Sequence, residues 1–207
     1  MEIIKDHRIE NKWHRGFSRD QTFDHTGKVI KVNHEEPYSI VLHGTGGGDT
    51  SEGIIKWMLS GGQLSNGKSR KKQYKRGVAL FHYLIDRRGK IVEIIDPDRW
   101  VFHSLSWTKD RFTIGIELVN PHPNNGDPYN SQQYESLFYL IFDHLFNKYP
   151  INTIVSHQRM AYKYSGKEKN CPGNFDYNKL EDELTNRDYI YSHNPNYESY
   201  WGIQKNE

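Results

Sequence analysis

The chain has 207 residues, a length that suits one domain with short appended segments. Its 28 Lys and Arg residues nearly balance its 26 Asp and Glu residues, and the formal net charge of +2 permits an anionic polymer as substrate without requiring one. The single cysteine excludes an intramolecular disulfide, and no apolar run approaches the roughly 18 residues of a membrane span.

The first part of the chain, residues 1–36, is polar and lacks sustained periodicity, so we expect an N-terminal extension that packs on the domain. Its beginning has no apolar region of the signal-peptide kind, which favours synthesis in the cytoplasm without a signal peptide. Residues 38–42 read Tyr-Ser-Ile-Val-Leu and predict a buried strand that ends at His43.

A glycine-rich turn follows this strand, because residues 43–49 read His-Gly-Thr-Gly-Gly-Gly-Asp. The turn matches neither a phosphate loop nor a dinucleotide motif, and we expect its glycines to let the backbone pass close beside His43. A helix is predicted over residues 50–60, with Asp49 or Thr50 as its cap. The basic run 68–76 favours a solvated surface loop over a nucleic-acid contact, since no nucleic-acid-binding motif accompanies it.

The remaining elements mix strands and helices. We predict a hairpin over residues 78–95, a strand over 112–119 that contains Glu117, and a helix over 131–147. A last strand over 153–156 ends at His157, and a last helix covers 176–184. The order predicts an α/β fold with a single mixed β-sheet flanked by helices, while the Tyr- and Asn-rich tail 186–207 has no interpretable pattern.

Two histidines that close β-rich runs and the only cysteine suggest a metal site. Imidazole nitrogen and thiolate sulfur are ligands that zinc takes readily, and a catalytic zinc site keeps three protein ligands with a fourth position open. Each of His43, His157 and Cys171 alone is more often structural. Together they predict a zinc hydrolase.

Four segments carry a more specific signal, and they occur in a fixed order. Residues 41–45 read Val-Leu-His-Gly-Thr, residues 81–89 read Phe-His-Tyr-Leu-Ile-Asp-Arg-Arg-Gly, and residues 114–118 read Ile-Gly-Ile-Glu-Leu. Residues 165–176 read Ser-Gly-Lys-Glu-Lys-Asn-Cys-Pro-Gly-Asn-Phe-Asp. The set resembles the type 2 N-acetylmuramoyl-L-alanine amidases, a family that includes phage lysozyme-type amidases, AmpD-like amidases and peptidoglycan recognition proteins. The resemblance covers residues 37–182 and implies an amidase domain over 37–185.

The resemblance implies roles for particular residues. It makes His43, His157 and Cys171 the zinc ligands, in a surface groove at one edge of the sheet. It makes Glu117 the group that activates water and Lys169 the cation that stabilises the oxyanion. These two roles agree with general chemistry, because a carboxylate in an apolar strand has a raised pKa and a cation near the metal offsets developing negative charge.

Substrate contacts are expected from two further residues. His103 falls where the family keeps a histidine that lines the substrate groove, although a structural role is nearly as well supported. Trp57 offers an aromatic surface for a sugar or a peptide, against core packing as the ordinary role of such a side chain.

The sequence departs from the family pattern in two places. Many relatives carry a catalytic tyrosine at the position of Phe81, which has no hydroxyl group. Glu117 therefore has to carry the proton transfer. The segment between His157 and Cys171 is longer than usual, and we expect residues 160–167 to form an extra loop over the metal.

Three functions stay open at this point. The first is a zinc amidase that cuts between the lactyl group of N-acetylmuramic acid and L-alanine, as a phage or prophage endolysin or a cell-wall recycling enzyme. The second is a peptidoglycan-binding module without catalysis, and the third is a zinc peptidase that acts within the stem peptide. We expect a monomer whose partner is peptidoglycan or a soluble muropeptide, with no nucleic-acid partner.

Overall fold

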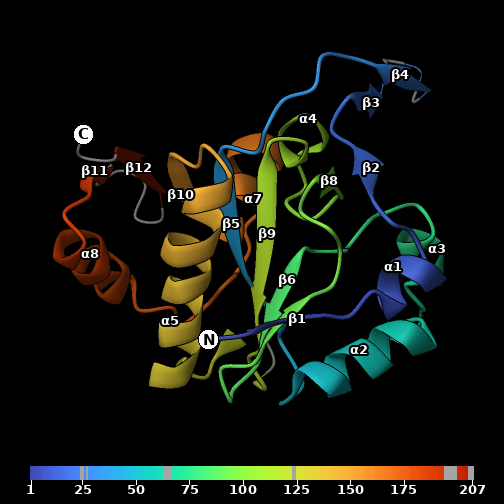
Figure 1. Cartoon of the computed structure of the whole chain (residues 1–207). Helices are drawn as coiled ribbons and strands as arrows, with labels where there is room; N and C mark the ends of the chain where they lie inside the picture. Colours follow the sequence, from blue (N-terminus) through green and yellow to red (C-terminus); the bar gives the residue numbers. More distant parts are fainter. Residues whose placement is uncertain (24–25, 27, 63–66, 123–124, 194–199, 205–207) are drawn as a thin grey trace.

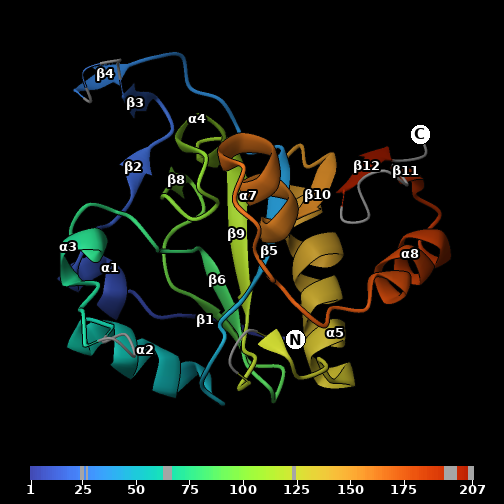
Figure 2. The same ribbon diagram turned by 180° about the vertical axis from the view of Figure 1, so that it is seen from behind.

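A central mixed sheet with helices on both faces organises the chain (Figures 1 and 2). The computed structural model describes residues 1–23, 26, 28–62, 67–122, 125–193 and 200–204. Within them the main sheet has eight strands, which confirms the predicted α/β class with a single mixed sheet. In sheet order the strands are β1 (Ile3–Lys5), β7 (Ile91–Glu93), β6 (Tyr83–Ile85), β9 (Thr113–Leu118), β5 (Ser39–Gly44), β10 (Thr153–Ser156), β12 (Tyr200–Gln204) and β11 (Ile190–His193).

The centre of the sheet is parallel. Strands β6, β9, β5 and β10 run in the same direction, and their carboxyl ends therefore meet at one end of the sheet. Antiparallel pairs join β6 to β7 and β10 to β12. Two small two-stranded sheets pair β2 (Phe17–Ser18) with β8 (Arg99–Trp100), and β3 (Gln21–Phe23) with β4 (Val29–Lys31).

Helices lie on both faces of the sheet. The helices are α1 (Arg8–Lys12), α2 (Ser51–Ser60), α3 (Lys71–Tyr74), α4 (Trp107–Asp110), α5 (Ser131–Phe138) with the π-helical stretch Tyr139–Leu145, α6 (Phe146–Lys148), α7 (His157–Ser165) and α8 (Tyr177–Asn186). Helix α5 crosses one face in Figure 1, whereas α7 lies over the opposite face in Figure 2.

Alternation along β5 assigns its side chains to these faces. Ile40 and Leu42 belong to the large apolar core that includes α5 and α8, and Val41 packs with Val155 and with Met160 of α7. Because side chains alternate along a strand, His43 lies on the α7 face together with Val41. The first candidate ligand is thus on the face that α7 covers.

Capping side chains define the predicted helices. Asn130 caps α5 by accepting a hydrogen bond from the Gln133 amide, in a reciprocal capping box. The helical conformation continues to Lys148, in agreement with the prediction over 131–147. Thr50 caps α2 by accepting a hydrogen bond from the Gly53 amide, as expected.

Two local predictions were wrong. Residues 160–167 do not form a loop over the metal, because α7 runs to Ser165 and ends at Gly166, which has a φ of 65°. The hairpin has shorter strands than expected, since the chain before Tyr83 is bent at Ala79, whose φ is 59°. The uninterpreted tail contains β11 and β12, which extend the main sheet beyond β10.

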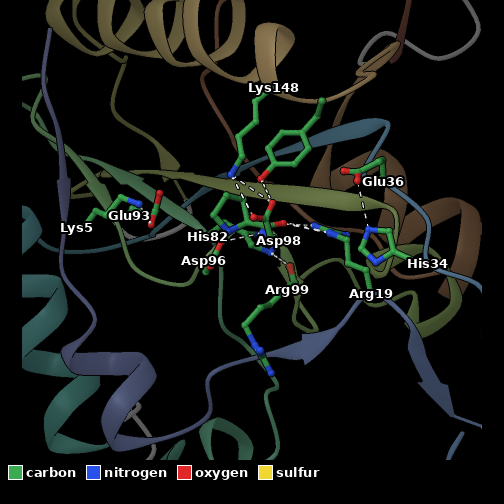
Figure 3. A network of polar contacts seen from close by, with 12 residues as sticks. Lys5, Arg19, His34, Glu36, His82, Glu93, Asp96, Asp98, Arg99 and Lys148 are labelled. Carbon is green, nitrogen blue, oxygen red and sulfur yellow. Dashed lines mark hydrogen bonds and ion pairs between the residues drawn. The ribbon is translucent and has the colours of Figure 1, made fainter. Parts of the chain in front are cut away.

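The N-terminal segment is integrated into the fold through β1 and through the buried side chain of Arg19. The Arg19 guanidinium donates hydrogen bonds to the carbonyl oxygen of Pro97, at 3.1 and 2.6 Å, and to that of Arg111. Figure 3 shows Arg19 beside the segment of Asp96, Asp98 and Arg99, with His82 close by. No helix among the described residues is long and apolar enough to cross a membrane.

Candidate metal centre

The structure brings the three predicted metal ligands together. One candidate ligand atom from each of His43, His157 and Cys171 lies within 4.8 Å of the others. The rings of His43 and His157 have their centroids 4.5 Å apart. Residues 128 positions apart in the chain therefore converge on one point.

The parallel sheet explains why the two histidines meet. Leu42 of β5 pairs with Ser156 of β10, so the next residue of each chain segment, His43 and His157, leaves the sheet at the same end. His157 is the first residue of α7, and the Ser156 hydroxyl caps that helix by accepting a hydrogen bond from the Arg159 amide. The cap fixes the direction in which the chain turns at His157.

Asn125 and Gly44 hold the cysteine loop against β5. The Asn125 side chain accepts a hydrogen bond from the Gly46 amide at 2.8 Å and donates one to the carbonyl oxygen of Asn170 at 2.7 Å. The Gly44 amide donates to the Cys171 sulfur at 3.3 Å. A Cβ atom at Gly44 would lie 2.6 Å from the Asn125 side-chain oxygen, so the close passage predicted for this turn is present at Gly44. Sequence reasoning missed Asn125, for which no motif gave a signal.

His103 lies behind His43 and is connected to it by a hydrogen bond. The Nε2 atom of His43 is 2.9 Å from Nδ1 of His103, and Nε2 of His103 is 2.8 Å from the Thr113 hydroxyl. That hydroxyl donates to the carbonyl oxygen of Asp110, so it accepts from His103 Nε2. His103 Nδ1 is then the acceptor, and His43 donates from Nε2, which leaves the Nδ1 lone pair of His43 available to a metal.

Burial keeps this histidine chain uncharged. Burial lowers the pKa of His43 and of His103 well below the ordinary value. The His103 side chain is only 2% exposed, so the structure places it behind a ligand and not on an open surface where a substrate would touch it. The Cβ position of Gly115 is 2.9 Å from His103 Nδ1, and only glycine leaves room for the ring.

Glu117 lies directly beside the candidate ligands, since it pairs with His43 across β9 and β5. Burial raises the pKa of its carboxyl group to about 8, and the nearby Arg70 opposes that rise. A carboxyl group with a pKa near neutrality can both accept and return a proton. Arg70 was not expected here, because the basic run 68–76 was predicted to be a solvated loop. Its Nε atom is buried and has no hydrogen-bond partner among the described residues.

The other predicted site residues lie at different depths. Lys169 is exposed two positions before Cys171, and its charge contributes to lowering the pKa of His157 to about 4, after the larger effect of burial. Trp57 is 39% exposed on α2, outside the buried face formed by Ile54, Ile55 and Met58. Phe81 is buried in the core that α2 covers.

The cluster fits a zinc ion by two independent observations. The Nε2 atom of His157 is buried and has no hydrogen-bond partner among the described residues, a costly arrangement unless another group satisfies it. Two imidazoles and one thiol are a donor set that suits zinc. Burial raises the pKa of the Cys171 thiol to about 12, so a cation beside it is needed for the thiolate to form near neutral pH.

Comparison with known proteins agrees with this geometry. The family model described as N-acetylmuramoyl-L-alanine amidase matches residues 33–174, and the chain belongs to this family. Among curated proteins no match was found.

Solved structures share the fold at low sequence identity. An endolysin N-acetylmuramoyl-L-alanine amidase, LysCS from Clostridium intestinale, is 20% identical with a TM-score of 0.57, covering 89% of this chain and 95% of that one. The peptidoglycan recognition protein PGRP-SA of Apis mellifera is 14% identical with a TM-score of 0.55, covering 87% and 95%. AmpD is 18% identical with a TM-score of 0.51, covering 87% and 98%. These neighbours include both enzymes and recognition proteins, so the fold does not decide between catalysis and binding.

Proposed function

We propose that this chain is a zinc-dependent N-acetylmuramoyl-L-alanine amidase, which hydrolyses the amide bond between the lactyl group of N-acetylmuramic acid and L-alanine of the peptidoglycan stem. The observation that carries the proposal is the combination of the His43, His157 and Cys171 cluster with Glu117 paired directly to His43. A recognition module needs no carboxyl group with a pKa near neutrality beside a metal cluster, whereas amide hydrolysis does.

The protein groups divide the chemistry among them. Zinc held by the three ligands would supply a Lewis acid that makes water more acidic and polarises the amide carbonyl. Glu117 accepts the proton of the attacking water and returns it to the leaving amine of L-alanine. Lys169 contributes positive charge near Cys171, which stabilises the negative charge that develops on the carbonyl oxygen.

Glu117 has to perform both proton transfers because Phe81 offers no hydroxyl group. The absence of a hydroxyl group at Phe81 is also the feature that favours a binding module without catalysis. In biological terms we propose a phage or prophage endolysin or a cell-wall recycling enzyme, which acts on the wall or on soluble muropeptides. The assay below includes both substrates for that reason.

The test measures hydrolysis of purified sacculi and of a soluble muropeptide, with mass spectrometry of the products and the zinc content of each protein. We expect stem peptides that begin with L-alanine. Glu117→Gln should retain zinc and lose activity by about 100-fold or more, because a positioned base contributes about that much. Cys171→Ala should lose zinc and activity together.

Glu135→Gln, which changes an exposed carboxylate on α5, is the matched control and should keep full activity. Zinc binding without release of peptides from either substrate would establish the binding module instead. Cleavage within the stem peptide would establish the peptidase.

A further inference from the structure

Asp110 carries a fully buried carboxyl group that the proposed chemistry does not use. It is the last residue of α4, which lies beside the start of β9 (Figures 1 and 2). Among the described residues it forms no ion pair with a lysine or an arginine, and the group at ion-pair distance is the His103 ring, whose Nε2 atom lies 3.7 Å from Oδ1. A buried carboxyl group without a cation is costly, so its presence calls for a physical reason.

Three donors from the residues before α4 face this carboxyl group. Oδ2 accepts from the His103 amide at 3.2 Å, and Oδ1 accepts from the Ser104 amide at 3.1 Å and from the Ser104 hydroxyl. Burial raises the pKa of the Asp110 carboxyl group to about 7, while these hydrogen bonds oppose the rise. Because all three neighbours donate, the arrangement matches the ionised carboxylate, which only accepts.

The carboxylate holds the bend of the chain that carries His103. Leu105, in this bend, has a φ of 65°, a conformation that is unfavourable for a residue other than glycine and persists where surrounding contacts impose it. The Asp110 amide closes the bend by donating to the carbonyl oxygen of Ser106 at 2.8 Å. Asp110 therefore fixes the place at which the chain presents the His103 ring.

Asp110 also acts on the His103 ring itself. The Thr113 hydroxyl donates to the Asp110 carbonyl oxygen at 3.1 Å and accepts from His103 Nε2 at 2.8 Å. The negative carboxylate, 3.7 Å from the same nitrogen, favours the tautomer that carries its proton on Nε2. That tautomer leaves Nδ1 of His103 to accept the hydrogen bond from His43.

We propose that Asp110 is a positioning residue of the metal centre: its carboxylate holds His103 in the place and the tautomer in which it accepts from His43, and so keeps Nδ1 of His43 available to the metal. The inference rests on the proposed function in taking zinc as the ion of the cluster. Because Asp110 acts through His103, its effect on zinc binding should disappear when His103 is replaced.

The zinc Kd, measured at pH 8 by competition with a chromophoric chelator, tests the proposal. This pH lies above the pKa of Asp110, so the carboxylate predominates. We expect Asp110→Asn to raise the Kd about 10-fold, because the substitution keeps the size of the side chain but places an amide nitrogen against a donor. In a protein that carries His103→Ala, the same substitution should change the Kd by less than about 2-fold.

Two control variants separate this role from general effects. Ser104→Ala removes a buried hydrogen bond to the same carboxylate but keeps its charge, and Asp182→Asn removes an exposed carboxylate. Both should bind zinc within about 2-fold of wild type. An unchanged Kd in Asp110→Asn would overturn the proposal. An equal rise in Ser104→Ala, or an equal rise with and without His103, would also overturn it, because either would indicate loosened packing.

Nuclear magnetic resonance of the metal-free wild type examines His103 without a substitution. Long-range proton–nitrogen correlations of the imidazole ring identify the nitrogen that carries the proton. We expect the proton on Nε2 in wild type and a mixture of both tautomers in Asp110→Asn. A proton on Nδ1 of His103 in wild type would overturn the proposal even if Asp110→Asn failed to fold.

Zinc affinity also separates this proposal from the proposed function. Zinc binding that depends on Asp110, in a protein that releases no stem peptide, would remove the amidase and leave the positioning role in place. Amidase activity together with an unchanged zinc Kd in Asp110→Asn would leave the amidase and remove the role of Asp110.

Discussion

The hydrogen bond from His43 to His103 makes the orientation of a candidate metal ligand depend on a buried residue behind it. Such partners fix the tautomer and the ring orientation of a ligating histidine. Here the partner is another histidine, whose own tautomer is set by the Thr113 hydroxyl. The line of hydrogen bonds ends at the Asp110 carbonyl oxygen, inside the protein.

His103→Ala should therefore weaken zinc binding without removing a ligand. We expect the zinc Kd to rise about 10- to 100-fold, as is usual when the partner of a ligating histidine is lost. Competition with a chromophoric chelator measures this Kd. His34→Gln, at an exposed histidine, is the control. Equal zinc affinity in wild type and His103→Ala would show that the hydrogen bond does not position His43.

His82 makes the stability depend on pH. Its Nδ1 atom accepts from the Gly115 amide, which only the neutral ring can do, and its Nε2 atom donates to the Arg99 carbonyl oxygen. Burial, with a smaller effect of Arg19, lowers its pKa to about 3. The unfolded chain takes up a proton near pH 6.5, whereas the folded chain does not. Stability is therefore complete above pH 6.5 and is lost as the pH falls towards 3.

This dependence can be measured by urea unfolding at pH 7 and pH 5. The free energy of unfolding of wild type should fall by about 2 kcal/mol more than that of His82→Gln over this range. Subtracting the change measured for His82→Gln from the change measured for wild type removes the contributions of the other titrating groups. An identical pH dependence in both would mean that His82 is not the group responsible.

At the scale of elements, β9 carries a glycine, Gly115, whose lack of a side chain leaves room for the His103 ring. Gly115→Ala places a Cβ atom against the His103 ring, and we expect it to cost about 1–3 kcal/mol of stability and to weaken zinc binding as well. Thermal unfolding and the chelator assay report the two effects. Gly47→Ala is the matched control, since nothing lies within 4 Å of its Cβ position. Equal effects of the two substitutions would contradict the packing argument.

Local patterns predicted the elements whose signals are local. The helix from Ser131 carries its cap and its apolar spacing within its own sequence, and β5 is built around the apolar run Ile40-Val41-Leu42. Helix α7 was missed because it buries only Met160 and Ala161 and has no broad apolar face. The residues at its two ends are nevertheless of types that commonly cap helices, Ser156 at the N-terminus and Gly166 at the C-terminus.

The three residues of the candidate metal cluster could be picked out because each stands next to a recognisable local sequence, whereas the residues that support them could not. Asn125 and Arg70 reach the cluster only through the folded arrangement of distant segments. The position of His103 depends on the space left by Gly115 on another strand, which no spacing along the chain encodes.

At the scale of the molecule, segments outside the central strands are part of the same structure. Arg19→Ala should lower the free energy of unfolding by about 3 kcal/mol, because it removes charged hydrogen bonds from a buried place. Chemical denaturation compares it with Arg15→Ala, an exposed control. A decrease in the free energy of unfolding of less than about 0.5 kcal/mol for Arg19→Ala would show that this contact of the N-terminal segment contributes little to stability.

Asn125 bonds to segments that lie far apart in the chain, the turn after β5 and the loop before Cys171. The distance between this turn and this loop is therefore fixed when the chain folds. The conformational entropy of bringing the two segments together is lost before an ion binds. Binding then has little ordering left to do, so a larger part of the intrinsic affinity of the ligands for the ion is realised. Metal-free protein should accordingly keep the cysteine loop in place, ready to take up the ion quickly and to release it slowly.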